Sequence, residues 1–122
     1  MSYDIALIPG DGIGPEVVDA TLPILDAAAT AAGFDIETTR YDWGTDRYLN
    51  EGAMMPEDGL DRLEDFDAIL LGAVGHPDVP DHVTLNGLLL PIRKGFDQSI
   101  CKRPAVLFEG VDSPLKGYSG GD

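Results

Sequence analysis

Two arginines in the second half of the chain, Arg93 and Arg103, have the clearest capacity for chemistry in this sequence. A guanidinium stays charged and offers a planar fork of N–H donors that matches a carboxylate. If Arg93 lies on a helix and Arg103 begins the next strand, a tight connection could direct both side chains to one pocket. The alternative is that each is a surface arginine that offsets an acidic chain, and composition alone favours this alternative.

A second feature with chemical potential is the glycine-rich loop that starts at Gly10 and ends at Gly14. A strand, a glycine loop and a helix make up a dinucleotide-binding turn. The spacing does not fit the G-x-G-x-x-G pattern, because Pro15 and Val17 stand where the last glycine is required. Two interpretations stay open: a phosphate cradle, or a tight turn that lets strand and helix pack closely, and the second is favoured.

The chain has few residues of the types that most often bind transition metals or form disulfides, with two histidines and one cysteine. His76 and His82 are six positions apart in a polar stretch, without thiolates nearby, and we expect exposed loop histidines and no metal site here. Cys101 is the only cysteine, so it cannot form an internal disulfide. We expect it to be a buried structural thiol and not a reactive one.

The elements that must position these residues alternate between strands and helices. Strands are expected at 3–9, 34–42 and 67–74, with a short candidate at 105–108. Helices are expected from Pro15 to a stop at Gly33, without a break at Pro23, and at 56–63 and 84–94, and 45–51 is helical or irregular. Residues 110–122 are predicted to be a loop. This order predicts an α/β layered fold with parallel strands and no domain boundary within 1–122.

Three strands would form a thin sheet with open edges, so we expect this chain to be part of something larger. Its net charge of −14, from 22 acidic and 8 basic residues, disfavours nucleic-acid and anionic-membrane partners. The same charge makes the chain repel itself, and concentrated salt screens that repulsion. We hypothesise that the protein is adapted to concentrated salt. The alternative is an acidic protein of an ordinary mesophile. No signal peptide or membrane span is visible in the sequence, which makes a cytoplasmic location the expectation.

Three motifs occur in order along the chain, at 7–16 (LIPGDGIGPE), 70–75 (LLGAVG) and 88–93 with 100–104 (LLLPIR, ICKRP). Together they resemble the isocitrate/isopropylmalate dehydrogenase family of decarboxylating 2-hydroxyacid dehydrogenases. Segments 79–85, 96–98, 109–111 and 113–115 are most similar to the tartrate/D-malate dehydrogenase branch. The resemblance implies the N-terminal part of that family's layered α/β fold, incomplete in this chain.

The resemblance also implies an activity: NAD-dependent oxidation of a malate-like 2-hydroxyacid, followed by loss of its β-carboxylate, with Mg²⁺ or Mn²⁺ as a Lewis acid. Arg93 and Arg103 match the first two substrate arginines of the family. Leu89 and Leu90 match positions that face the variable side of the substrate, although both could equally be core residues. A small dicarboxylate is then the substrate, and a homodimer is the expected assembly.

For the cofactor, the resemblance implies two contacts. The loop of Gly72, Ala73, Val74 and Gly75 would run beside the nicotinamide, where Gly75 permits close approach of the main chain. Asn86 could hydrogen-bond the amide or the ribose of NAD. We expect tryptophan here in the tartrate branch and glutamate in isopropylmalate enzymes, so tartrate, D-malate and 3-isopropylmalate all stay open as substrates.

The remaining catalytic groups of the family are expected beyond residue 122. These are the third substrate arginine, the catalytic tyrosine and lysine, the aspartates that bind the metal, and the loop that holds the adenosine of NAD. No catalytic residue or metal ligand is therefore assigned here, and the isolated chain is predicted to be inactive. One alternative is a short non-catalytic binding or assembly module derived from the same fold, and another is an unrelated α/β domain that binds a small anion.

Overall fold

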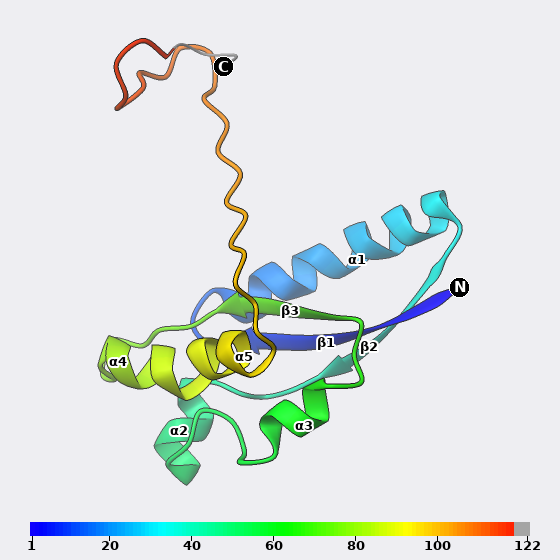
Figure 1. The fold of residues 1–122 in the computed structure, drawn as a ribbon, viewed down its shortest axis with the longest axis vertical. Coiled ribbons are helices and arrows are strands. Elements are labelled where there is room, and N and C mark those ends of the chain that lie inside the picture. The colour runs from blue at the N-terminus through cyan, green and yellow to red at the C-terminus, as the bar shows by residue number, and fades with distance from the viewer. Residues whose placement is uncertain (119–122) are drawn as a thin grey trace.

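The computed structural model describes residues 1–118 and shows a three-stranded parallel sheet between two layers of helices (Figure 1). Strand β1 (Ser2–Gly10) is central, β2 (Asp35–Arg40) and β3 (Ala68–Ala73) flank it, and the order is β2-β1-β3. Ile5 pairs with Thr38 on one side and with Ala68 on the other. Parallel neighbours require crossover connections, which the intervening helices provide. The predicted α/β fold with parallel strands is confirmed.

Helix α1 (Gly14–Ala32) covers one face of the sheet. Val18 and Ala29 are its buried apolar side chains, at a spacing that returns to the same helix face. Gly33 ends the helix in the left-handed conformation, with φ of 78°, and donates its N–H to the carbonyls of Ala29 and Thr30. The prediction of one helix that continues through Pro23 is confirmed.

The hydrophobic core lies on the other face, under α2 (Thr45–Glu51) and α3 (Gly59–Leu63). Ala6 and Ile8 alternate along β1 and so point to the same side. Helix α3 is shorter than predicted because 56–59 forms a turn, in which the Gly59 N–H donates to the Pro56 carbonyl at 3.0 Å. The buried members of the core are Ala6, Ile8, Trp43, Met54, Leu63, Leu88 and Ile92.

Residues 81–95 form one helical segment in three parts: α4 (Asp81–Thr84), the π-helical turn η1 (Leu85–Leu89) and α5 (Leu90–Gly95). The predicted helix at 84–94 is present but begins three residues earlier. The π turn has a local cause, since Pro91 lacks an N–H and its ring crowds the carbonyl four residues back. The wider turn adapts to it, and the Leu90 N–H donates to the Leu85 carbonyl, five residues back.

After α5 the chain runs away from the sheet as an extended trace (Figure 1). The predicted strand at 105–108 is wrong: no strand is found in the described residues after Ala73. A strand needs hydrogen bonds to a neighbour, and this segment pairs with neither outer strand of the sheet, β2 or β3. For the same reason Cys101 is exposed, so its expected burial is also wrong. The loop predicted from 110 is confirmed through 118, and 119–122 lie outside the described residues.

Candidate functional site

The carboxyl ends of the parallel strands meet at one edge of the sheet. Gly10, the last residue of β1, pairs with Ala73, the last residue of β3. In open parallel sheets, ligands bind outside this edge, where the loops that follow neighbouring strands diverge. The glycine loop after β1 and the 72–75 segment after β3 therefore lie where a ligand site is expected.

The glycine loop packs strand β1, helix α1 and strand β3 closely together. A Cβ on Gly14 would lie 2.0 Å from the Pro9 carbonyl oxygen and 2.8 Å from the Ala73 nitrogen. A Cβ on Gly72 would lie 2.3 Å from the same Pro9 oxygen. The loop is therefore a tight turn that brings backbones into contact, which is the favoured interpretation and not the phosphate cradle.

Asp11, inside that loop, makes buried contacts at the site that the sequence interpretation missed. Only 8% of it is exposed, and its carboxylate accepts three hydrogen bonds from two distant segments. Oδ1 accepts from the Thr45 N–H at 2.6 Å, and Oδ2 accepts from the Thr45 hydroxyl at 2.7 Å and the Gly75 N–H at 2.9 Å. The available signal was an acid between two glycines in a loop that must pack tightly.

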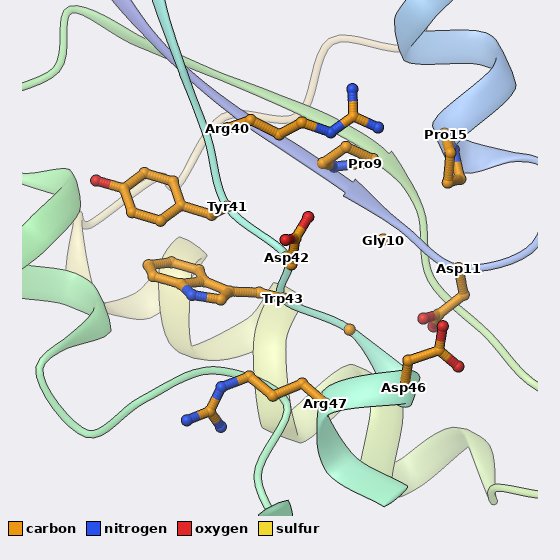
Figure 2. A pocket seen from close by; sticks show the side chains of 11 residues that line it. Pro9, Gly10, Asp11, Pro15, Arg40, Tyr41, Asp42, Trp43, Asp46 and Arg47 are labelled. Carbon is orange, nitrogen blue, oxygen red and sulfur yellow. The ribbon is translucent and has the colours of Figure 1, made fainter. Parts of the chain in front are cut away.

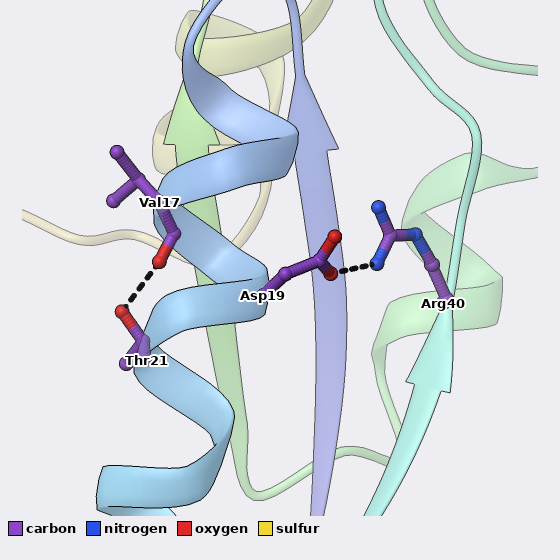
Figure 3. Close-up of polar contacts among 4 residues, drawn as sticks. All are labelled: Val17, Asp19, Thr21 and Arg40. Atoms are coloured by element: carbon purple, nitrogen blue, oxygen red, sulfur yellow. Dashed lines mark hydrogen bonds and ion pairs between the residues drawn. The ribbon is translucent and has the colours of Figure 1, made fainter.

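Beside Asp11 lies a hollow of about 210 Å³, between the ends of β1 and β2 and the start of α2 (Figure 2). Its two arginines already have partners. Arg40 pairs with Asp19 of α1 at 2.7 Å (Figure 3), and Arg47 pairs with Glu51 at 2.6 Å and donates to the Ala53 carbonyl at 2.8 Å. The two cationic side chains of the hollow are therefore paired with acids that do not line it, and the acidic groups of its lining are Asp11, Asp42 and Asp46.

The 72–75 segment ends β3 and leads into the loop before α4. Gly72 and Ala73 are the last residues of the strand, and Val74 packs against the core cluster. Gly75 has φ of 152° and no atom within 4 Å of the position that a Cβ would occupy. Its backbone is therefore open to close approach by another molecule, as the sequence predicts.

The helical segment positions four of the predicted site residues. Arg93 and Leu90, both half-buried on α5, line one surface hollow of about 380 Å³. Asn86 is exposed, and its Nδ2 donates to the His82 carbonyl at 2.6 Å. Leu89 is half-buried, whereas Leu88 beside it is fully buried in the core.

Arg103 does not join Arg93 in this structure. It is exposed on the extended segment that leaves the body after α5 (Figure 1). Arg93 is on a helix, as expected, but Arg103 does not begin a strand, so the tight connection predicted between them is not formed. The segment 103–108 runs away from the sheet and pairs with neither of its outer strands (Figure 1).

The two histidines lie in different local environments. His76 is half-buried, and its Nδ1 accepts the Asp78 N–H at 3.1 Å. His82 is exposed but belongs to α4 and not to a loop, which corrects the expectation for that residue. Within residues 1–118, no group of three or more His, Cys, Asp or Glu could hold a metal ion. The same residues contain no helix long and apolar enough to cross a membrane.

A parallel α/β chain with a glycine turn after β1, an open glycine after β3 and a half-buried arginine on the next helix has the layout of a protein that binds a ligand at the carboxyl edge of its sheet. The comparison with protein families is more specific: the isocitrate/isopropylmalate dehydrogenase model matches residues 4–121, so the chain belongs to that family.

Several relatives cover nearly all of the chain. A probable tartrate dehydrogenase/decarboxylase of Agrobacterium vitis is 54% identical over 121 residues, which are 98% of this chain and 34% of the relative. The decarboxylating D-malate dehydrogenase of Escherichia coli is 48% identical, over 97% of this chain and 33% of the relative. The chain thus spans about a third of the length of these curated relatives.

The fold agrees with a solved member of the same group. The crystal structure of the apo form of a β-decarboxylating dehydrogenase from Thermococcus kodakarensis superimposes with a TM-score of 0.61 and 33% identity. The match covers 78% of this chain and 27% of that structure. The predicted family and the predicted N-terminal part of its layered fold are both confirmed.

Proposed function

We propose that this chain is the N-terminal part of an NAD-dependent oxidative decarboxylase that acts on a malate-like 2-hydroxyacid: tartrate, D-malate or 3-isopropylmalate. The observation that supports it most is the 54% identity with a tartrate dehydrogenase/decarboxylase across 98% of the chain. Arg93, Leu90 and Asn86 all lie on the helical segment that follows β3, which is consistent with a shared site.

In the proposed reaction, Arg93 binds the substrate. The hollow that it lines with Leu90 also contains Lys94, and both side chains come from the last turns of α5. A half-buried guanidinium forms stronger hydrogen bonds with a carboxylate than a fully solvated one does, because less water competes. Arg103 is proposed to reach the same carboxylate once the segment after α5 is paired with a strand edge.

NAD, when bound, accepts the hydride from the hydroxyl-bearing carbon. Two features of this chain fit its nicotinamide. Gly75 leaves open space above its backbone, and Gly72, Ala73 and Val74 precede it at the carboxyl edge of the sheet. One N–H of Asn86 Nδ2 donates to the His82 carbonyl, and Oδ1 is the proposed acceptor for a carboxamide N–H or a ribose hydroxyl.

The divalent cation of the proposal, Mg²⁺ or Mn²⁺, does not fit the residues described here, because they supply no set of ligands for it. No step of the reaction is therefore assigned to it in this chain. The remaining proposals are a homodimeric assembly, a small dicarboxylate as ligand, a cytoplasmic location, and neither nucleic acid nor membrane as a partner.

The test is an assay of the whole protein that contains this chain. NADH formation is followed with each of the three hydroxyacids and Mn²⁺, for the wild type, Arg93→Gln and Arg62→Gln. Arg62 is a matched control, since it is also on a helix and is paired with Asp58 at the surface. We expect a loss of kcat/KM of roughly 100-fold or more for Arg93→Gln, as for a charge-assisted contact to substrate, and less than twofold for Arg62→Gln.

Two results would count against the proposal. One is a whole protein that oxidises none of the three acids at any salt concentration. The other is an intact mass of 13.0 kDa for the native polypeptide, which would favour the non-catalytic binding or assembly module.

A further inference from the structure

Asp11 connects three segments that are far apart in the sequence. Its main-chain N–H donates to the Ala73 carbonyl at 2.7 Å, while its carboxylate accepts from Gly75 and from Thr45. The loop after β1, the loop after β3 and the start of α2 are therefore held by one residue. Figure 2 shows the Asp11 side chain directed toward the start of α2.

The surroundings are shaped around this carboxylate. A Cβ on Gly44 would lie 2.6 Å from Asp11 Oδ1, and Gly44 has φ of 156°. Only glycine combines that conformation with that space, so Gly44 lets the carboxylate reach the Thr45 N–H. Thr45 is fully buried, and both of its donors are used by Asp11.

Asp11 restrains the 73–75 segment, whose main chain would otherwise be flexible because it contains Gly75. Glycine has the greatest conformational freedom of all residues, and Gly75 has open space where a side chain would stand. Two hydrogen bonds, one from Asp11 N–H to Ala73 and one from Gly75 N–H to Asp11 Oδ2, fix the main chain on both sides of Val74. The peptide between Val74 and Gly75 therefore has a defined orientation.

We propose that Asp11 is a positioning residue that holds the 73–75 loop in the conformation that receives the nicotinamide, and that it couples this loop to α2 through Thr45. The inference rests on the proposed function, because the role of the 72–75 segment in cofactor binding belongs to it. Asp11 itself touches neither substrate nor cofactor in this proposal.

The sharpest variant is Asp11→Asn, which keeps the shape and removes one acceptor. If the amide nitrogen takes the place of Oδ1, it faces the Thr45 N–H. If it takes the place of Oδ2, it faces the Gly75 N–H. In either orientation one main-chain donor opposes another donor and loses its hydrogen bond. Asp42→Asn is the matched control. Asp42 is exposed and lines the same hollow, and its replacement by asparagine removes the same charge.

Two measurements test the proposal separately. In the whole protein, we expect Asp11→Asn to raise the KM for NAD about tenfold or more, with the KM for the hydroxyacid changed less than twofold, and Asp42→Asn to change neither. A purely structural role would lower the amount of active enzyme without separating the two KM values. Equal effects on both would overturn the positioning role.

In the 122-residue chain, amide hydrogen exchange at Gly75 and at Thr45 reports the two main-chain hydrogen bonds to Asp11 without any catalysis. In Asp11→Asn, we expect exchange at least tenfold faster than in Asp42→Asn at whichever of these two N–H groups faces the new amide nitrogen, with Trp43 fluorescence as the check on folding. Unchanged exchange at both would overturn the proposal. If Asp11→Asn does not fold, Thr45→Val replaces it, and Thr45→Ser, which restores the hydroxyl, is its control. Amide exchange at Gly75 that is no faster in Thr45→Val than in the wild type would overturn the coupling. An inactive wild type would refute the proposed function alone.

Discussion

Replacing Gly14 with alanine places a methyl group where two strands leave no space for it. The new Cβ would lie 2.0 Å from the Pro9 oxygen and 2.8 Å from the Ala73 nitrogen, and both obstacles are main-chain atoms of the sheet. They cannot rotate away as a side chain can. Relief therefore requires the first turn of α1 to move outward by about 1.4 Å, the difference between 2.0 Å and the 3.4 Å at which ordinary contacts begin.

The cost follows from what that movement opens. Val18, one turn further along α1, is 1% exposed, and its contact with the sheet weakens when the helix lifts. Overpacking typically costs about 1–3 kcal/mol, and a rigid obstacle places this site near 3 kcal/mol. A chain of this length has an expected stability of roughly 6–18 kcal/mol. The variant therefore loses a large fraction of it, with a Tm lower by about 12 °C at roughly 4 °C per kcal/mol.

Urea unfolding followed by Trp43 fluorescence provides the measurement, since that side chain is 5% exposed in the folded chain. Gly59→Ala is the matched control, because Gly59 also begins a helix, and a Cβ there meets the flexible Met55 side chain at 3.1 Å. Its effect is expected to stay within about 1 kcal/mol. A Gly14→Ala variant within about 0.5 kcal/mol of the wild type, the range of ordinary surface substitutions, would refute the close-packing argument.

Three further outcomes are expected. Circular dichroism should show the chain gaining stability as KCl is added, because salt screens its net charge of −14, and complete folding in dilute buffer with no gain would contradict this. The 122-residue chain alone should form no NADH from D-malate with Mn²⁺, and any steady formation would show that it holds the missing groups. Arg40→Gln, which breaks the exposed pair with Asp19 (Figure 3), should cost less than about 1 kcal/mol and less still in concentrated KCl, as denaturation midpoints at two salt concentrations will show.

The regular elements of the fold were predictable because their signals are local. The three strands lie within two residues of the ranges expected from apolar runs, and Gly33 ends α1 as its position predicts. The π turn before Pro91 was not predictable in type, since a helix can adapt to an internal proline by a kink, a break or a wider turn. Tertiary packing selects among these responses.

The site was less predictable because its contacts join distant segments. The hydrogen bonds of Asp11 cross 34 positions to Thr45 and 64 positions to Gly75, and no local pattern indicates them. The strand expected at 105–108 failed for a related reason: its β propensity is real, but a strand also requires an edge to pair with. Arg93 was placed correctly on a helix, near the end of the one expected at 84–94.

The order of the strands also has a consequence for synthesis. Strand β1, which is synthesised before β2 and β3, is the centre of the sheet, yet its partner Ala68 follows Ile5 by 63 residues. At translation rates of about 5–20 residues per second, that interval lasts roughly 3–13 s. During this time the edge of β1 that pairs with β3 has no strand beside it. Nascent chains of this protein should therefore depend on chaperones until β3 emerges, and the acidic charge would limit their aggregation meanwhile.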